Sequence, residues 1–248
     1  MFKTDGSVHH GGVKNEAKTV DILNSLNLYS EHVETRGGTK VKEDAVAGDK
    51  KISIKKKEGI SVGSFDWFNT SKYNYLFGES FSGFLGKMKQ MRDLPAEVRS
   101  DEEFVSLTRS MFNDTCEEAL ENLTAEDITN ILTEGFCKDN EAMDIVINDV
   151  KVKKLYIFQI ANHPAFKLLN EGFTPVLKGA GKSSRQILFT NGKDTYNVGL
   201  RLRVTSNNGI NAFLGLSKAN KNSQVVVKLQ QDDVKGLVEK AHSQVYAY

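Results

Sequence analysis

Cysteine, proline and tryptophan are scarce in this sequence, with two, three and one respectively in 248 residues. Cys116 and Cys137 stand 21 residues apart without a second pair, which argues against a disulfide framework or a zinc site and favours buried free thiols in a reducing compartment. No apolar run approaches the roughly 18 residues of a membrane helix. The first fifteen residues also lack a hydrophobic stretch. We therefore expect a cytoplasmic protein with neither a membrane span nor a secretory signal.

The net charge of +1 conceals a strong segregation of charge along the chain. Residues 101–150 hold 14 acidic and 2 basic side chains, whereas residues 151–230 hold 13 lysines and arginines against 2 acids. A basic segment of this length is typical of a protein that binds a polyanion, most often nucleic acid. The alternative is that the two segments neutralise each other within one fold.

Hydrophobic periodicity predicts an α/β chain of the α+β type. We expect helices from Val13 and over residues 72–92, 101–120, 125–136 and 232–242, with Thr124 and Asp127 forming a capping box. We expect a hairpin over residues 40–57 and strands over 155–160, 186–190, 195–205, 210–216 and 224–229. This order predicts an N-terminal part over 1–71, an acidic helical insert over 72–150 and a basic, β-rich part over 151–248.

The predicted hairpin carries the residues that point to chemistry. If Gly48-Asp49 is its two-residue turn, Asp44 lies opposite Ser53, and Lys55 follows on the same face. The other face is apolar except for Glu43, with Val41, Ala45, Ala47, Ile52 and Ile54. A carboxylate beside a lysine on a rigid sheet suits phosphodiester hydrolysis, because the carboxylate holds Mg²⁺ and the ammonium positions the attacking oxygen.

One carboxylate rarely holds Mg²⁺ alone, and Glu16 is the candidate for a second. It lies within the apolar stripe of the predicted N-terminal helix, between Val13 and Val20. An acid on a face that packs against a sheet needs a partner, and a metal ion at the sheet would supply one. The alternative is that Glu16 lies at the edge of the stripe and reaches water.

The run Lys42-Glu43-Asp44-Ala45-Val46, followed by Ile52-Ser53-Ile54-Lys55-Lys56, resembles the metal-binding hairpin of the PD-(D/E)XK nuclease superfamily. The resemblance implies a restriction-endonuclease-like αβββαβ core with a mixed sheet, to which the helical insert is added. It also implies that Asp44, Ser53 and Lys55 line a Mg²⁺ site, with Glu16 as the helix acid. Glu43 stands where the family often has Pro, and Ser53 where it usually has Glu or Asp. Some restriction endonucleases that read short sites have an uncharged residue at the latter position.

The region from Gly199 to Gln230 resembles the C-terminal part of restriction-endonuclease-like proteins of bacteria and their phages. Arg201 and Arg203 project from one face of a predicted strand, where they suit phosphates or a guanine edge. The loop over residues 178–185 is interpreted as a basic loop on DNA or as a solvated turn. The other candidates for the DNA surface are Lys182, Arg185, Asn222 and Lys228.

These patterns predict a Mg²⁺-dependent endonuclease of double-stranded DNA, of the type II restriction class or a phage relative in the host cytoplasm. The alternatives are a non-catalytic DNA-binding protein on the same scaffold, which Ser53 makes plausible, and a structure-selective repair nuclease. The aromatic residues between Phe65 and Phe84 are expected to pack in the core or at a homodimer interface.

Overall fold

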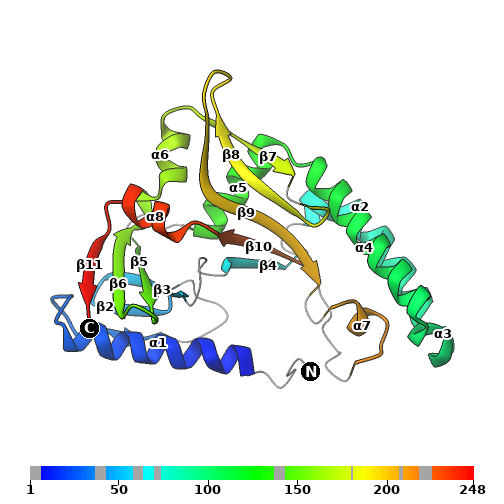
Figure 1. Ribbon diagram of the computed structural model, residues 1–248, viewed down its shortest axis with the longest axis horizontal. Helices are drawn as coiled ribbons and strands as arrows, with labels where there is room; N and C mark the ends of the chain where they lie inside the picture. Colours follow the sequence, from blue (N-terminus) through cyan, green and yellow to red (C-terminus); the bar gives the residue numbers. More distant parts are fainter. Residues whose placement is uncertain are drawn as a thin grey trace.

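The computed structural model of the protein describes residues 7–36, 43–57, 64–69, 74–136, 143–179, 181–206, 209–217 and 225–248. The described residues form a mixed α/β fold in which two sheets and several helices share one large core (Figure 1). This agrees with the expected combination of helices and a mixed sheet.

The first sheet, called sheet A, is mixed and six-stranded, in the order β1-β2-β3-β5-β6-β11. Its strands are β1 (Glu34–Thr35), β2 (Ala45–Ala47), β3 (Lys50–Lys57), β5 (Asp144–Asp149), β6 (Lys154–Gln159) and β11 (Gln244–Ala247). β3 and β5 pair in parallel, and the other neighbours pair antiparallel. Sequence periodicity did not predict β5, because all six of its residues are buried and a strand buried on both faces shows no alternation.

The second sheet, called sheet B, is antiparallel and five-stranded, in the order β4-β10-β9-β8-β7. Its strands are β4 (Ser64–Asn69), β7 (Thr174–Gly179), β8 (Ser184–Thr190), β9 (Thr195–Ser206) and β10 (Val225–Gln231). Most of it therefore comes from the basic part of the chain, and β4 joins from the N-terminal part. Figure 1 shows β8 and β9 as a long curved hairpin above the other elements.

The helices are α1 (Ser7–Ser25), α2 (Asn74–Arg92), α3 (Ala96–Ser100), α4 (Glu102–Glu121), α5 (Ala125–Phe136), η1 (Ile160–Asn162), α6 (Pro164–Asn170), α7 (Ile210–Phe213) and α8 (Val234–Lys240). The capping box at the start of α5 is confirmed, since the Thr124 N–H donates to Asp127 Oδ2 at 2.9 Å and the Asp127 N–H donates to Thr124 Oγ1 at 3.2 Å. In the described part of the chain, no helix is both long enough and apolar enough to cross a membrane.

The strand predicted over residues 210–216 is wrong, because this segment begins with helix α7. Ile210, Phe213 and Leu214 are all buried in the core. Their spacing of three and four residues is the helical period, which a short apolar run cannot distinguish from a buried strand in the sequence.

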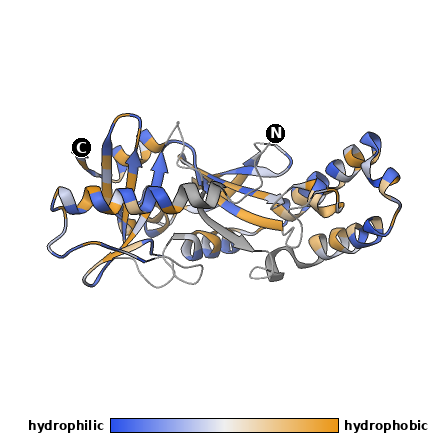
Figure 2. Cartoon of the chain, turned by 90° about the horizontal axis from the view of Figure 1, so that it is seen from below, coloured by the Kyte–Doolittle hydropathy of each residue, from blue (hydrophilic) through white to orange (hydrophobic). Residues whose placement is uncertain are grey.

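The core is divided by sheet A. On one face, Val20 and Leu23 of α1 pack with Ile52 and Ile54 of β3. On the other face, β5 contributes Ile145 to the larger cluster, which includes residues from sheet B and from α2, α4, α5 and α8. Figure 2 shows hydrophobic and hydrophilic residues alternating along the helices, as in helices that bury one face.

Two aromatic residues of the predicted cluster lie in this larger core. Phe84 packs against Phe112 and Phe213, with ring centroids 5.4 and 5.8 Å away, and Phe81 lies 6.4 Å from Phe112. Cys116 is buried and free, as expected, and burial raises the pKa of its thiol. Cys137 lies outside the described residues.

The C-terminal residue closes a buried polar network between α1 and sheet A. The Tyr248 hydroxyl donates to Asn148 Oδ1 at 2.6 Å, and Asn148 Nδ2 donates to Thr19 Oγ1 at 2.9 Å. Asn148 is fully buried on β5, so both ends of its amide need these partners. The network connects the first helix, the central strand and the end of the chain.

Candidate active site

The β2–β3 hairpin has the predicted register. Ala45 pairs with Ile52 and Ala47 with Lys50, which leaves Gly48-Asp49 as a two-residue turn. Gly48 has φ +56°, the left-handed conformation that the first position of such a turn favours. Asp44 immediately precedes β2, and its N–H donates to the Ile52 carbonyl at 2.9 Å. The turn and the pairing thus bring Asp44 beside the middle of β3.

Asp44, Ser53 and Lys55 form one cluster. Asp44 Oδ2 accepts hydrogen bonds from Ser53 Oγ at 3.1 Å and from the Ile54 N–H at 2.6 Å. Lys55 Nζ lies 3.9 Å from the same oxygen. Two hydrogen bonds and a nearby ammonium group on one carboxylate oxygen fix the orientation of the Asp44 side chain and leave Oδ1 as the oxygen that can bind a further group.

The two faces of β3 differ in burial and chemistry. Ile52 and Ile54 pack under α1, while Ser53 and Lys55 alternate with them and point to the opposite face. Ser53 is buried, whereas the side chains of Asp44 and Lys55 keep 24% and 17% of their exposure. The charged pair therefore remains accessible to a ligand while the hydroxyl beside it is enclosed.

Glu43, the exception on the apolar face, is buried beside Arg36. The two side chains form an ion pair at 3.2 Å. A backbone hydrogen bond, with Lys51 and Arg36 nearby, holds the pKa of the Glu43 carboxyl below its usual value. Glu43 thus stays charged without a metal ion. Val41 and Lys42 lie outside the described residues.

The structure does not bring Glu16 to Asp44. Glu16 lies on α1, which covers the face of sheet A opposite to Ser53 and Lys55. It is also displaced along the sheet: Thr19, one turn later in α1, contacts Asn148, which pairs with Lys56 near the end of β3. The pairing of these two acids at one metal ion stays a prediction that this arrangement does not favour, because the stripe of α1 and the polar face of β3 are on different sides of the sheet.

Among the described residues, no three histidine, cysteine, aspartate or glutamate side chains come close enough to form a metal site. Within the cluster of Asp44, Ser53 and Lys55, Asp44 is the one carboxylate, and it lies beside the lysine. Asp44 can hold Mg²⁺ here only if phosphate oxygens and water supply the other ligands. Mg²⁺ commonly adopts this arrangement with one or two protein carboxylates.

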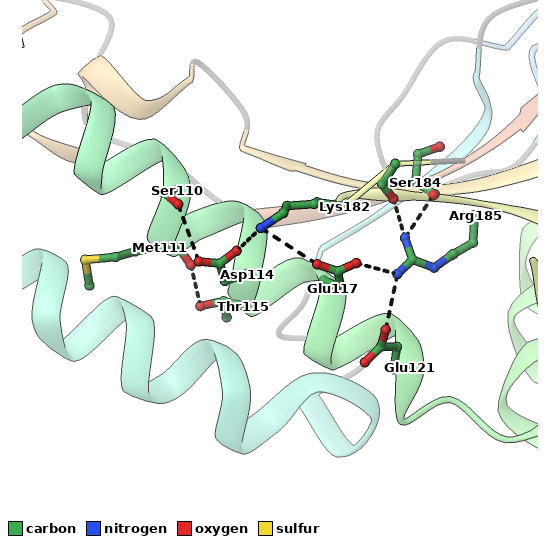
Figure 3. Close-up of polar contacts among 10 residues, drawn as sticks. Ser110, Met111, Asp114, Thr115, Glu117, Glu121, Lys182, Ser184 and Arg185 are labelled. Carbon is green, nitrogen blue, oxygen red and sulfur yellow. Dashed lines mark hydrogen bonds and ion pairs between the residues drawn. The ribbon is translucent and has the colours of Figure 1, made fainter. Parts of the chain in front are cut away.

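The basic loop before β8 is held by the acidic helix α4 (Figure 3). Lys182 Nζ lies 2.5 Å from Asp114 Oδ1 and 4.0 Å from Glu117 Oε2. Arg185 NH2 lies 3.3 Å from Glu117 Oε1 and 3.6 Å from Glu121 Oε1. Lys182 is well exposed, so its pairs contribute little to stability, but Arg185 is buried. Here the two oppositely charged segments neutralise each other, which was the alternative interpretation of the charge pattern.

Other basic candidates lie on the polar face of sheet B. Arg203 pairs across the sheet with Lys228, and Arg201 pairs with Gln230. Burial, together with the nearby Arg203, lowers the pKa of Lys228. Arg201 forms an ion pair with Asp232, whereas Arg203 is exposed. Asn222 lies outside the described residues.

A second acid–base pair on sheet A was not predicted from the sequence. Lys57 forms an ion pair with Asp149, whose side chain is 4% exposed, on the same face as Lys55. The alternation of Ser53, Lys55 and Lys57 was a usable signal for the lysine. Asp149 could not be found because β5 was not predicted.

Comparison of the chain with models of known families, with curated proteins and with solved structures found no match.

Proposed function

We propose that this protein is a Mg²⁺-dependent endonuclease that hydrolyses phosphodiester bonds in double-stranded DNA, in the manner of a sequence-specific restriction enzyme. The observation that carries the proposal is the cluster of Asp44, Ser53 and Lys55, in which a partly exposed carboxylate is oriented beside an ammonium group. A carboxylate that can hold a metal ion and an ammonium group that can hold a phosphate or an attacking oxygen suit phosphodiester hydrolysis.

The order of elements supports the proposal. α1 is followed by β1, β2 and β3 of sheet A, then by β4, which joins sheet B, then by a helical region, and then by β5, which pairs in parallel with β3. Within sheet A alone, this order is compatible with the αβββαβ core that the resemblance to the PD-(D/E)XK superfamily implies, with β4 as an additional strand in sheet B. The hairpin with Asp44 and Lys55 occupies the second and third strands of that order.

Each residue of the cluster has a distinct role in the proposal. Asp44 Oδ1 provides a ligand for Mg²⁺, which, when bound, neutralises the phosphate and lowers the pKa of a bound water. Ser53 is a positioning residue, because its hydroxyl and the Ile54 N–H hold the other carboxylate oxygen. Lys55 holds the attacking oxygen or the phosphate from the same face. Glu16 receives no role, because α1 lies on the other side of the sheet.

The polar face of sheet B is the proposed DNA surface. Cross-strand pairs place Arg203 beside Lys228 in one row and Arg201 beside Gln230 and Gln186 in the next. Two rows of cationic and amide side chains offer both phosphate contacts and groups that read base edges. Arg185 pairs in register with the core residue Leu202 and therefore lies on the opposite face of sheet B, where α4 holds both Arg185 and Lys182, so neither belongs to the proposed surface.

The test is incubation of supercoiled plasmid with the protein and Mg²⁺, with EDTA as the control. Asp44→Asn and Lys55→Met should abolish cleavage and retain DNA binding. Asp49→Asn and Lys50→Met, exposed sites on the same hairpin, should cut like the wild type. Discrete bands would support sequence-specific cleavage, and a smear would instead indicate a nonspecific or repair nuclease. Full activity of Asp44→Asn would contradict the assignment of the site.

One observation favours a second candidate, a non-catalytic DNA-binding protein. Ser53 stands where the PD-(D/E)XK superfamily usually has an acidic metal ligand. In addition, the described residues contain no group of three metal-ligating side chains. On this alternative, the wild-type protein retards DNA in a gel but leaves it uncut at every Mg²⁺ concentration. That result would exclude the enzyme and retain the DNA surface.

A further inference from the structure

A pocket of about 620 Å³ lies between helix α8 and the end of sheet A. β3, β5, β6 and β11 supply its floor, and α8 with the residues after it supplies one wall. Its volume is in the range of small-molecule sites in proteins. Lys57 lines it, only two residues beyond Lys55 on the same face of β3, which corresponds to about 7 Å along the strand.

The polar side of this pocket is a row of charges across three strands. Asp149 on β5 pairs in register with Lys57 on β3 and with Lys154 on β6, so one carboxylate lies between two lysines on one face. Asp149 forms an ion pair with Lys57, and its Oδ1 accepts a hydrogen bond from the Lys151 N–H at 3.3 Å. Lys154 forms no ion pair with any described residue and is exposed at the pocket. It therefore offers an unneutralised positive charge.

α8 adds a further cation and a buried hydroxyl. Lys235 lines the pocket from the first turn of α8 and, within the described part of the chain, forms no ion pair. Ser243 Oγ is buried and lacks a hydrogen-bond partner among the described residues, although it too lines the pocket. A buried hydroxyl without a partner is costly unless a ligand or water satisfies it.

The remaining lining is mostly apolar and includes the ring of Tyr156, with Glu239 and His242 as its polar members. Tyr156 on β6 is half-buried at the floor, and the valines around it are Val152, Val234, Val238 and Val245. A flat aromatic or apolar body would cover these side chains and remove Val152 and Val245 from water, where they are now more than half exposed. The pocket therefore combines an anion-binding side with an apolar side.

We propose that this pocket binds a nucleoside phosphate, with the phosphate at Lys154 and Lys235 and the base against Tyr156 and the valine wall. The ligand has two sources: a free mononucleotide, or an unstacked nucleotide of the DNA strand whose neighbouring phosphate lies at Lys55. The second source rests on the proposed nuclease function, and the first does not.

Calorimetric titration with dTMP, thymidine and inorganic phosphate tests the pocket directly. Because dTMP uses both sides of the pocket, it should bind at least about tenfold more tightly than thymidine or phosphate alone. Lys154→Gln and Lys235→Gln should each weaken dTMP binding by about three- to tenfold. Lys240→Gln, on the same helix but outside the pocket, is the matched control and should bind dTMP like the wild type.

A second titration, of a 5′-phosphorylated oligothymidylate into the same variants, distinguishes a free mononucleotide from a nucleotide of a DNA strand as the ligand. If Lys154→Gln and Lys235→Gln weaken the oligonucleotide but free dTMP does not bind, the occupant is a nucleotide of a strand. If dTMP binding depends on both lysines, the free nucleotide is a ligand. The proposal is overturned if neither ligand depends on the two lysines, or if Lys240→Gln weakens binding equally. Asp44→Asn separates the two proposals: it should stop cleavage but leave dTMP binding unchanged.

Discussion

The stability of the protein should fall steeply between pH 7 and pH 5 because of one buried histidine. His163 is fully buried at the start of α6, where its Nδ1 accepts the Ala165 N–H at 3.1 Å. Its Nε2 lies 3.4 Å from Gln231 Oε1, so the proton of the neutral ring is on Nε2. Burial lowers the pKa of His163 to about 3.

The sign and size of the effect follow from linkage. In the unfolded chain His163 is protonated below about pH 6.5, whereas in the folded protein it stays neutral down to about pH 3. The stability that His163 contributes is therefore complete above pH 6.5 and is lost as the pH falls. Between pH 7 and pH 5 the loss amounts to about 2 kcal/mol in the free energy of unfolding.

His163→Asn is the variant that isolates this effect. Asparagine keeps a side-chain oxygen to accept the Ala165 N–H, since it is a preferred residue at a helix N-cap, but it does not titrate. Urea denaturation of both proteins at pH 7 and pH 5 gives the loss of stability for each. The wild type should lose about 2 kcal/mol more than the variant. Equal losses in the two proteins would refute the assignment of a depressed pKa to His163.

Three further predictions concern the C-terminus, a glycine within β9 and the DNA surface. Tyr248→Phe should lower the free energy of unfolding by about 1–3 kcal/mol, because it removes a partner from the buried asparagine of β5. Tyr246→Phe, whose hydroxyl contacts an exposed glutamine, should change it far less in the same urea titration. Gly199→Ala should cost more stability than Gly192→Ala: both glycines have positive φ, but a Cβ on Gly199 would lie 2.7 Å from an amide nitrogen while Gly192 faces open space. Arg203→Ala should weaken DNA binding and reduce the salt dependence of log K by about one unit, measured by fluorescence anisotropy, and an unchanged slope would remove it from the phosphate contacts.

The hairpin and its cluster were predictable from the sequence because they are local. A two-residue turn at Gly48-Asp49 fixes the register, and strand alternation then assigns Ser53 and Lys55 to one face. The capping box of α5 was predictable for the same reason, since its two residues are three positions apart. In each case, the geometry follows from a short stretch of chain.

The features that escaped prediction depend on contacts between distant segments. β5 pairs with a strand about 90 positions earlier in the chain, and burial on both faces removes its periodic signal. The contact of Lys182 with Asp114 joins residues 68 positions apart. The apolar stripe predicted for the first helix includes Glu16, and this suggested a metal site. The sequence does not reveal which face of sheet A that helix covers.

The central claim is that Asp44 and Lys55 cleave DNA with Mg²⁺, and the most direct test is single-turnover cleavage of a labelled duplex at equal DNA occupancy. The wild-type rate should rise with Mg²⁺ to a plateau and vanish in EDTA. The Asp44→Asn rate should be at least about 1000-fold lower at the same plateau, with DNA binding retained. Cleavage by Asp44→Asn at the wild-type rate, or wild-type cleavage that persists in EDTA, would contradict the account.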